Sequence, residues 1–398
     1  MHYKSIDIFC HIIDNFGDVG IAYRFAKEFK LAHLSCDVRL FVSDLRPLKG
    51  ILPVIDSLQT VQEHEGIVFV DSTKLDNILV DALGTADVLV EAMGCEIPEA
   101  VMKKAEQRDT LIINLEYLSA EKWIKEYHRK PSLLPQARLK KYFYMPGFTS
   151  ESGGVIIDSQ VEMSRQSLSD DRIKHLNSHL KNFGISLTDT KDTLFGSIFT
   201  YARGFDTFLS DIGKIDKTIY LFIFGQKSRE SMIQSLHRAQ AVIMSDAHYT
   251  LKNIQVLIMP FLPQTVYDQF LCLTDFNIVR GEDSFVRAIL SGKPFIWNAY
   301  LQENIYHRVK VEAFLEMFSN YFNDDIAFKN YSELLLEFNQ AAEEQQVQTT
   351  RERYDNFFED LNKINHATRE MSYFIRFNCD LVKKLTGFLN QIQMEMVQ

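Results

Sequence analysis

Residues 280–284 (Arg-Gly-Glu-Asp-Ser) have the residue types of a phosphate-binding turn. They follow an apolar run typical of a buried strand, and Asp283 or Ser284 can cap the helix that follows. A helix start offers unpaired N–H groups and a partial positive charge, and Arg280 adds a cation. The carboxylates of Glu282 and Asp283 can accept hydrogen bonds from sugar hydroxyls. The pattern predicts a sugar-nucleotide site, although an ordinary capped helix has the same pattern.

A second candidate cluster lies in residues 14–20 (Asp-Asn-Phe-Gly-Asp-Val-Gly), in the first predicted strand-to-helix turn. Asp14 and Asp18 lie on a predicted loop that turns back at Gly17, so both carboxylates can face one point. Such a pair suits a general base or a site for a cationic acceptor. The same residues are also typical of a plain turn followed by a helix cap.

A dinucleotide site is the alternative interpretation of this turn. Gly17 and Gly20 lie where a dinucleotide-binding fold keeps its glycines, and Asp44 ends the second predicted strand, where a ribose-binding acid would lie. The spacing is not Gly-x-Gly-x-x-Gly, and Asp14 and Asp18 would repel a pyrophosphate. An NAD-dependent oxidoreductase is therefore the competing enzyme class.

Alternating apolar runs and helical patterns predict two successive α/β halves and a terminal helix. Each half would hold a parallel sheet with helices on both faces, and its site would lie outside the carboxyl ends of the strands. A helix is predicted over 21–31, directly after the loop 14–20. The predicted strands are 6–13, 37–43, 66–70, 88–91, 110–115, 193–200, 218–224, 255–259, 276–279 and 294–297.

The composition narrows the class of protein. A chain of 398 residues is too long for one core, which favours two domains. A net charge of -10 argues against sequence-independent binding of nucleic acid. The five cysteines are scattered and the histidines show no ligand spacing, so no disulfide framework or metal site is predicted. No targeting segment or membrane-spanning run is found, and a cytoplasmic location is expected.

Several motifs together resemble the bacterial elongation factor P arginine rhamnosyltransferases, the EarP family. They are residues 14–20 with Arg24, the run Pro260-Phe261-Leu262-Pro263-Gln264-x-x-Tyr267-Asp268, and residues 280–288 (Arg-Gly-Glu-Asp-Ser-Phe-Val-Arg-Ala). Residues 114–121 and 142–148 also fit. The match covers most of the chain, in the expected order.

The resemblance implies a GT-B glycosyltransferase fold, in which two Rossmann-like domains face each other across a cleft. The acceptor-binding domain would cover 1–180, with the terminal helix 362–398 packing back on it, and the nucleotide-sugar-binding domain would cover 190–361. The reaction would transfer L-rhamnose from dTDP-β-L-rhamnose to one arginine of elongation factor P, with inversion and without a metal or other cofactor. The modified factor would then rescue ribosomes stalled at polyproline.

The resemblance also assigns roles by position. Asp14 and Asp18 would be the catalytic acids. From the chemistry of a guanidinium acceptor, Asp18 is taken as the base and Asp14 as the group that holds the guanidinium, and the reverse assignment stays open. Glu282 is a third catalytic candidate, which would contact the guanidinium or the sugar. The donor-binding candidates are Asn15, Phe16, Gly17, Phe199, Tyr201, Gln264, Tyr267, Arg280, Glu282, Asp283 and Ser284.

Phe199 and Tyr201 are the candidates to sandwich the thymine. Three alternatives stay open from the sequence. They are a GT-B enzyme with another sugar or acceptor, the NAD-dependent oxidoreductase, and a non-catalytic module that docks on a translation factor.

Overall fold

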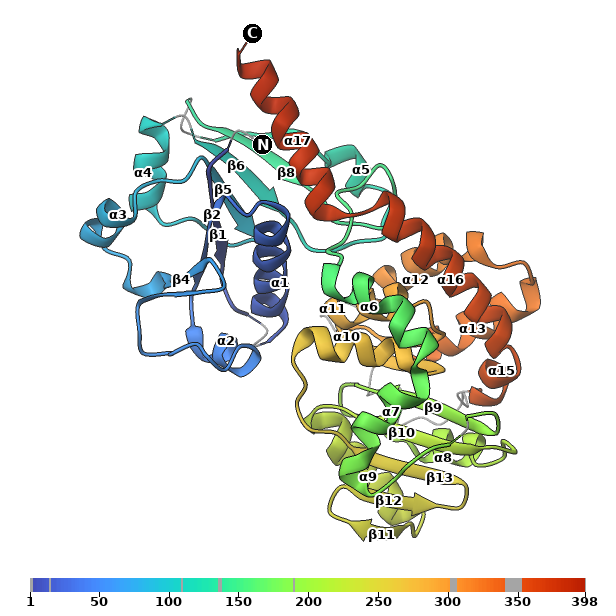
Figure 1. Cartoon of the computed structure of the whole chain (residues 1–398). Helices are drawn as coiled ribbons and strands as arrows, with labels where there is room; N and C mark the ends of the chain where they lie inside the picture. The colour runs from blue at the N-terminus through green and yellow to red at the C-terminus, as the bar shows by residue number, and fades with distance from the viewer. Residues whose placement is uncertain are drawn as a thin grey trace. The chain divides into compact units, whose positions relative to one another are not determined.

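The computed structural model describes residues 3–13, 16–108, 110–134, 138–188, 190–300, 306–340 and 353–397 (Figure 1). The chain divides into two compact units, Met1–Ser159 with Ile375–Gln398, and Gln160–Phe374. These limits differ from the predicted boundaries at 180 and 362. Residues 160–180 join the second unit because Leu168, Leu176 and Leu180 pack into its hydrophobic core.

The first unit is built on a mainly parallel sheet with the strand order β3-β4-β2-β1-β5-β6-β8-β7. Its inner strands are short runs of Val, Ile, Leu and Phe, as strands buried on both faces require. β3 and β7 pair antiparallel at the two edges. The strands are β1 (Ser5–Cys10), β2 (Asp37–Val42), β3 (Val61–His64), β4 (Ile67–Asp71), β5 (Val88–Ala92), β6 (Leu111–Leu115), β7 (Pro131–Ser132) and β8 (Lys140–Tyr144).

Helices cover both faces of this sheet. They are α1 (Gly17–Ala32), α2 (Leu45–Ile51), α3 (Asn77–Leu83), α4 (Glu99–Gln107), α5 (Ile124–Tyr127) and α17 (Leu381–Val397), with a 3-10 turn at Ser72–Lys74. Figure 1 shows α1 on one side of the sheet and α3 and α4 on the other. Side chains of α1 and α17 share one core with the inward residues of β1 and β2, so the last helix stabilises the first unit.

A buried ion pair crosses the opposite face of the sheet. Asp7 of β1 and Arg39 of β2 are register partners, and the Arg39 guanidinium binds both carboxylate oxygens of Asp7, with Nη2 to Oδ2 at 2.7 Å. Arg39 also donates to the carbonyls of Leu83 and Gly84 at the end of α3. This pair therefore fixes α3 against the sheet.

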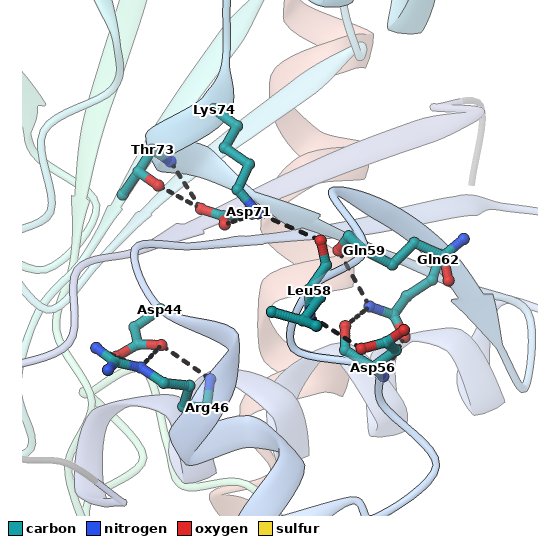
Figure 2. A network of polar contacts seen from close by, with 9 residues as sticks. All are labelled: Asp44, Arg46, Asp56, Leu58, Gln59, Gln62, Asp71, Thr73 and Lys74. Carbon is teal, nitrogen blue, oxygen red and sulfur yellow. Dashed lines mark hydrogen bonds and ion pairs between the residues drawn. The ribbon is translucent and has the colours of Figure 1, made fainter.

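Polar contacts order the loops at the carboxyl ends of β2 and β4 (Figure 2). Asp44 caps α2 by accepting from the Arg46 amide at 2.9 Å, and the Arg46 guanidinium binds the same carboxylate. Asp71 accepts from the Thr73 amide and pairs with Lys74 at 2.9 Å. Asp44, the acid that the dinucleotide interpretation would use for a ribose, thus serves as a helix cap.

The second unit has the sheet order β11-β12-β13-β10-β9-β14-β15. The strands are β9 (Thr193–Ile198), β10 (Thr218–Ile223), β11 (Val242–Ser245), β12 (His248–Leu251), β13 (Ile254–Ile258), β14 (Phe276–Arg280) and β15 (Phe295–Asn298). β11 and β12 are antiparallel additions at one edge, and the other strands run parallel.

The helices of the second unit connect these strands and extend to the terminal region. They are α6 (Ser159–Asp170), α7 (Arg172–Leu180), α8 (Asp206–Ile212), α9 (Gln226–Arg238), α10 (Gln264–Leu273), α11 (Asp283–Ser291), α12 (Tyr306–Phe318), α13 (Asp325–Phe338), α15 (Tyr354–Glu359) and α16 (Leu361–Asn378), with 3-10 turns at Lys181–Phe183 and Ser319–Tyr321. α16 carries the chain back to the first unit, which begins again at Ile375.

In both sheets the order of the strands reverses at one point, and a ligand of an open α/β sheet binds outside the carboxyl ends there. In the first unit the reversal falls between β1 and β5, and in the second between β9 and β14. The turn after β1 leads to Asp18. Tyr201 lies in the turn after β9, and Arg280 is the last residue of β14. The topology thus places Asp18 at one switch point, and Tyr201 and Arg280 at the other.

The structure corrects two local predictions. α1 begins at Gly17, so residues 17–20 are helical and not a loop, because the Gly20 amide bonds to the Phe16 carbonyl at 3.1 Å. The predicted terminal helix 362–398 is not continuous, since α16 ends at Asn378 and α17 starts at Leu381. Among the described helices, none combines the length and apolar character needed to cross a membrane.

We expect Arg39→Met to lower the free energy of unfolding by about 3–5 kcal/mol, because the substitution leaves a buried carboxylate without its cation. Urea unfolding followed by circular dichroism measures the change. Arg46→Met is the matched control, since its side chain is 82% exposed beside Asp44. A loss in Arg39→Met no larger than in the control would contradict the role of the pair.

Candidate active site

Asp18 lies in the first turn of α1 and is held by the backbone that precedes the helix. Its Oδ2 accepts a hydrogen bond from the Ile13 amide at 2.8 Å, and the residue is only 6% exposed. A carboxylate in this position is fixed in orientation and stabilised by the positive end of the helix. Asp14 and Asn15 lie outside the described residues.

The two other predicted donor residues of this turn have local structural roles. The Phe16 ring lies against α2, where a Cβ on Gly50 would come within 2.6 Å of it. Gly17 is the first residue of α1. Among the described residues of 14–20, Asp18 thus carries the carboxylate that a hydrogen bond orients.

A buried ion pair fixes α1 to the segment before α6. Arg24 Nη1 and Asp158 Oδ2 are 3.3 Å apart, and each side chain is 2% exposed. Glu28, one turn further along α1, accepts from the Ser159 amide at 3.1 Å. Burial raises the pKa of Glu28, and the nearby Asp158 carboxylate adds to the rise. The helix that carries Asp18 is therefore anchored by charge pairing in the interior of the first unit.

In the second unit Arg280 lies against two aromatic rings. Its guanidinium carbon is 4.4 Å from the centroid of Phe199 and 4.9 Å from that of Tyr201, which is the geometry of cation–π attraction. Arg280 Nη1 also donates to the carbonyl of Thr200 at 3.4 Å. The cation that ends β14 is thus bound to the turn that follows β9.

The turn after β14 is held from β15. Gly281 has φ +67°, a conformation that side chains rarely adopt. Its amide donates to the Asn298 carbonyl at 3.1 Å, and its carbonyl accepts from Trp297 Nε1 at 2.8 Å. Asn298 Oδ1 in addition accepts from the Tyr201 amide at 3.1 Å. These bonds fix the turn after β9 and the turn after β14 relative to each other on the two sides of the switch point.

Both carboxylates at the start of α11 have cationic partners. Glu282 Oε1 is 2.8 Å from Lys310 Nζ, and Asp283 Oδ1 is 3.4 Å from Arg287 Nε. Ser284 follows within the first turn of the helix. Both acids are therefore paired with a cation, which reduces the repulsion that their negative charges would exert on a bound anion.

Tyr267 of α10 joins the aromatic group of the switch point. Its ring packs edge to face on Phe199, with centroids 5.9 Å apart, and on Phe224 at 5.2 Å. Burial raises the pKa of Tyr267, and contact with Ser284 opposes the rise. Gln264 is the first residue of α10 and is half-buried. The structure thus gathers Phe199, Tyr201, Tyr267 and residues 280–284 in one region of the second unit.

Among the residues of this region that were not predicted, three carry a charge or an aromatic ring next to the predicted ones. Lys310 is on α12, Lys227 has its Nζ 5.7 Å from the Tyr201 ring centroid, and Tyr300 packs on Tyr201 with centroids 5.6 Å apart. Lys227 and Tyr300 each follow a predicted strand, so their position near a strand end could have indicated them as candidates for the site. Lys310 has no sequence signal, because only the fold brings α12 to the start of α11.

The chemistry of this region is that of an anion site beside aromatic faces. Cations and the N-terminus of α11 attract phosphate, and the rings offer stacking to a base. Among the residues that the structure describes, no group of three or more His, Cys, Asp or Glu is arranged to hold a metal ion.

Comparison with known families decides the class of the protein. Residues 6–390 match the model of the elongation factor P (EF-P) rhamnosyltransferase EarP. The chain belongs to the EarP family. It is therefore an enzyme, a glycosyltransferase of this family.

Curated relatives agree with this assignment. A protein-arginine rhamnosyltransferase of Shewanella oneidensis is 34% identical over 85% of this chain and 86% of its own length. One of Pseudomonas aeruginosa is 33% identical over 79% and 81%, and one of Neisseria meningitidis is 30% identical over 77% of each chain.

Solved structures confirm the fold. A structure that describes the basis of EarP-mediated arginine glycosylation of EF-P superimposes with a TM-score of 0.60, at 21% identity over 97% of this chain and 99% of that chain. A UDP-GlcNAc 2-epimerase of Neisseria meningitidis, bound to UDP-GlcNAc, gives a TM-score of 0.52 at 11% identity over 98% and 100%. The predicted α/β GT-B fold with two Rossmann-like parts is confirmed.

We expect Gly225→Ala to displace the Phe199 ring, because a Cβ at this φ +77° residue would lie 2.6 Å from it. Gly184→Ala is the matched control, since Gly184 has φ +70° and no neighbour within 4 Å. Overpacking should cost Gly225→Ala about 1 kcal/mol more of unfolding free energy than the control. Equal urea midpoints for the two variants would contradict the packing described here.

Proposed function

We propose that this enzyme transfers L-rhamnose from dTDP-β-L-rhamnose to the guanidinium of an arginine in elongation factor P, with inversion at the sugar. The observation that carries the proposal is the aromatic and cationic site at the β9/β14 switch point, in a chain that belongs to the EarP family. The second unit would hold the donor, and the first unit would supply the acid of Asp18.

The donor diphosphate would bind at Arg280 and the first turn of α11. There the helix offers its N–H groups and Ser284 offers its hydroxyl. Both can donate hydrogen bonds to an anion. The thymine would stack between Phe199 and Tyr201. Because Arg280 lies over both rings, this sandwich requires its guanidinium to move toward the diphosphate when the donor binds.

The acceptor reaction would form one C–N bond and break one C–O bond. A guanidinium nitrogen attacks C1 of the rhamnose on the face opposite the diphosphate, and dTDP leaves with the bonding electron pair. The nitrogen gives its proton to Asp18. A guanidinium with a pKa above about 12 is a poor nucleophile, so a carboxylate that binds it and takes this proton supplies general-base catalysis.

Further parts of the proposal rest on the family resemblance. Asp14 would hold the guanidinium beside Asp18, and Glu282 would contact the acceptor or the sugar from the donor side. Asn15, Phe16 and Gly17 would border the donor, and Gln264 would line the nucleotide pocket. The modified elongation factor P would rescue ribosomes stalled at polyproline.

We expect Asp18→Asn to lower the transfer rate by about 10²–10⁴-fold, the range for removal of a general base, while dTDP-rhamnose binds as before. The asparagine Oδ1 can still accept from the Ile13 amide, so the start of α1 is preserved. Calorimetry measures donor binding, and mass spectrometry of elongation factor P measures transfer.

Asp44→Asn is the control for this variant, since Asp44 caps α2 and is the acid that the dinucleotide interpretation requires. We expect transfer in Asp44→Asn to equal that of the wild type. If Asp18→Asn lost donor binding as strongly as it lost transfer, Asp18 would belong to the nucleotide site. That result would contradict its role as the base.

We propose that catalysis needs no metal, since Arg280 and the helix N-terminus can neutralise the leaving diphosphate. The expected result is an unchanged transfer rate after treatment with EDTA. Arg280→Met should lower the rate under the same conditions. Activity that disappears on chelation and returns with Mg²⁺ would refute this account of the leaving group.

A further inference from the structure

Glu282 occupies the N-cap position of α11, yet its side chain makes no capping hydrogen bond to the described residues of this helix. Its carboxylate binds Lys310 Nζ at 2.8 Å instead. Lys310 comes from α12, 28 residues further along the chain. The two side chains are 22% and 25% exposed, so the pair is partly shielded from water.

A carboxylate at the start of a helix can accept hydrogen bonds from the free amides there. At this helix such a contact would occupy the N–H groups that the diphosphate needs. The uncompensated charge would also repel an anion placed there. A diphosphate can therefore bind at this helix start only if another side chain holds the Glu282 carboxylate away from it.

The charges around the turn fit this requirement. Lys310 pairs with Glu282, and Arg287 pairs with Asp283. Arg280 lies on the aromatic rings of Phe199 and Tyr201. With both carboxylates paired, the cation of Arg280 gives the region an excess of positive charge, which a diphosphate can use.

We propose that Lys310 is a positioning residue of the donor site. It holds the Glu282 carboxylate away from the first turn of α11 and neutralises it, which leaves that turn open to a diphosphate. This inference rests on the proposed function, because it assigns the same turn to the donor. Lys310 acts through Glu282 and not by touching the nucleotide.

A double-mutant cycle with dTDP as the probe tests the inference. Calorimetry measures the dissociation constant of dTDP for the wild type, Lys310→Met, Glu282→Gln and the double variant. We expect Lys310→Met to weaken binding about tenfold, the effect of one uncompensated charge in a partly shielded site. The double variant should recover affinity to within about twofold of Glu282→Gln alone, because the repelling carboxylate is gone.

Two further variants separate positioning from a loss of fold. Lys310→Arg keeps the charge and should keep the affinity. Lys329→Met removes a lysine that pairs with Glu333 on α13 and is 74% exposed, and it should have no effect on binding. Circular dichroism checks that each variant is folded. If Lys310→Met alone unfolds, the double variant still tests the pair, because both of its members are then neutral.

The outcomes distinguish a failure of the proposed function from a failure of the role of Lys310. A wild-type protein that does not bind dTDP overturns the proposed function, and the inference with it. Wild-type binding that Lys310→Met leaves unchanged overturns the inference alone. An equal loss in Lys310→Met and in the double variant also overturns it, since it would mean that Lys310 contacts the nucleotide directly.

Discussion

The proposed donor site depends on residues 280–282, where β14 ends and the chain turns into α11. Its backbone conformation is possible because Gly281 tolerates a positive φ, and bonds from Trp297 and Asn298 hold it in place. The turn sets Arg280 against the aromatic rings that follow β9 and directs the start of α11 to the same place. Everything that we propose for the diphosphate follows from this geometry.

The first unit orients its acid by a different means. Asp18 is fixed by a backbone amide, and α1 is anchored by the buried pair of Arg24 and Asp158. Breaking such a pair costs more than the pair contributes, because the remaining charge is buried without a partner. The interior charges therefore hold α1, which carries Asp18, at a defined position relative to its own sheet.

Much of the fold could be predicted from the sequence, because buried parallel strands are continuous apolar runs. The runs near 276–279 and 193–200 became β14 and β9, and Arg280 and Tyr201 follow directly from their ends. The edge strands β11 and β12 were not predicted. β11 is a short run, Val-Ile-Met-Ser, and all four residues are exposed, so its apolar residues do not form part of a buried strand.

Other features depend on tertiary structure alone. Residues 17–20 contain two glycines and an acid, which are typical of a loop, yet the first turn of α1 forms there. The Arg24–Asp158 pair joins residues 134 positions apart, and Lys310 reaches Glu282 across 28 positions. No local pattern reports such pairs, since the fold must first bring the elements together.

The central claim is that this enzyme glycosylates an arginine of elongation factor P with rhamnose. The most direct test is the intact mass of elongation factor P from the same organism, after incubation with the enzyme and dTDP-β-L-rhamnose. The account predicts a gain of one deoxyhexose residue, located on an arginine by fragmentation. An unchanged mass, from an enzyme that binds dTDP in the same buffer, would contradict the proposed sugar or acceptor.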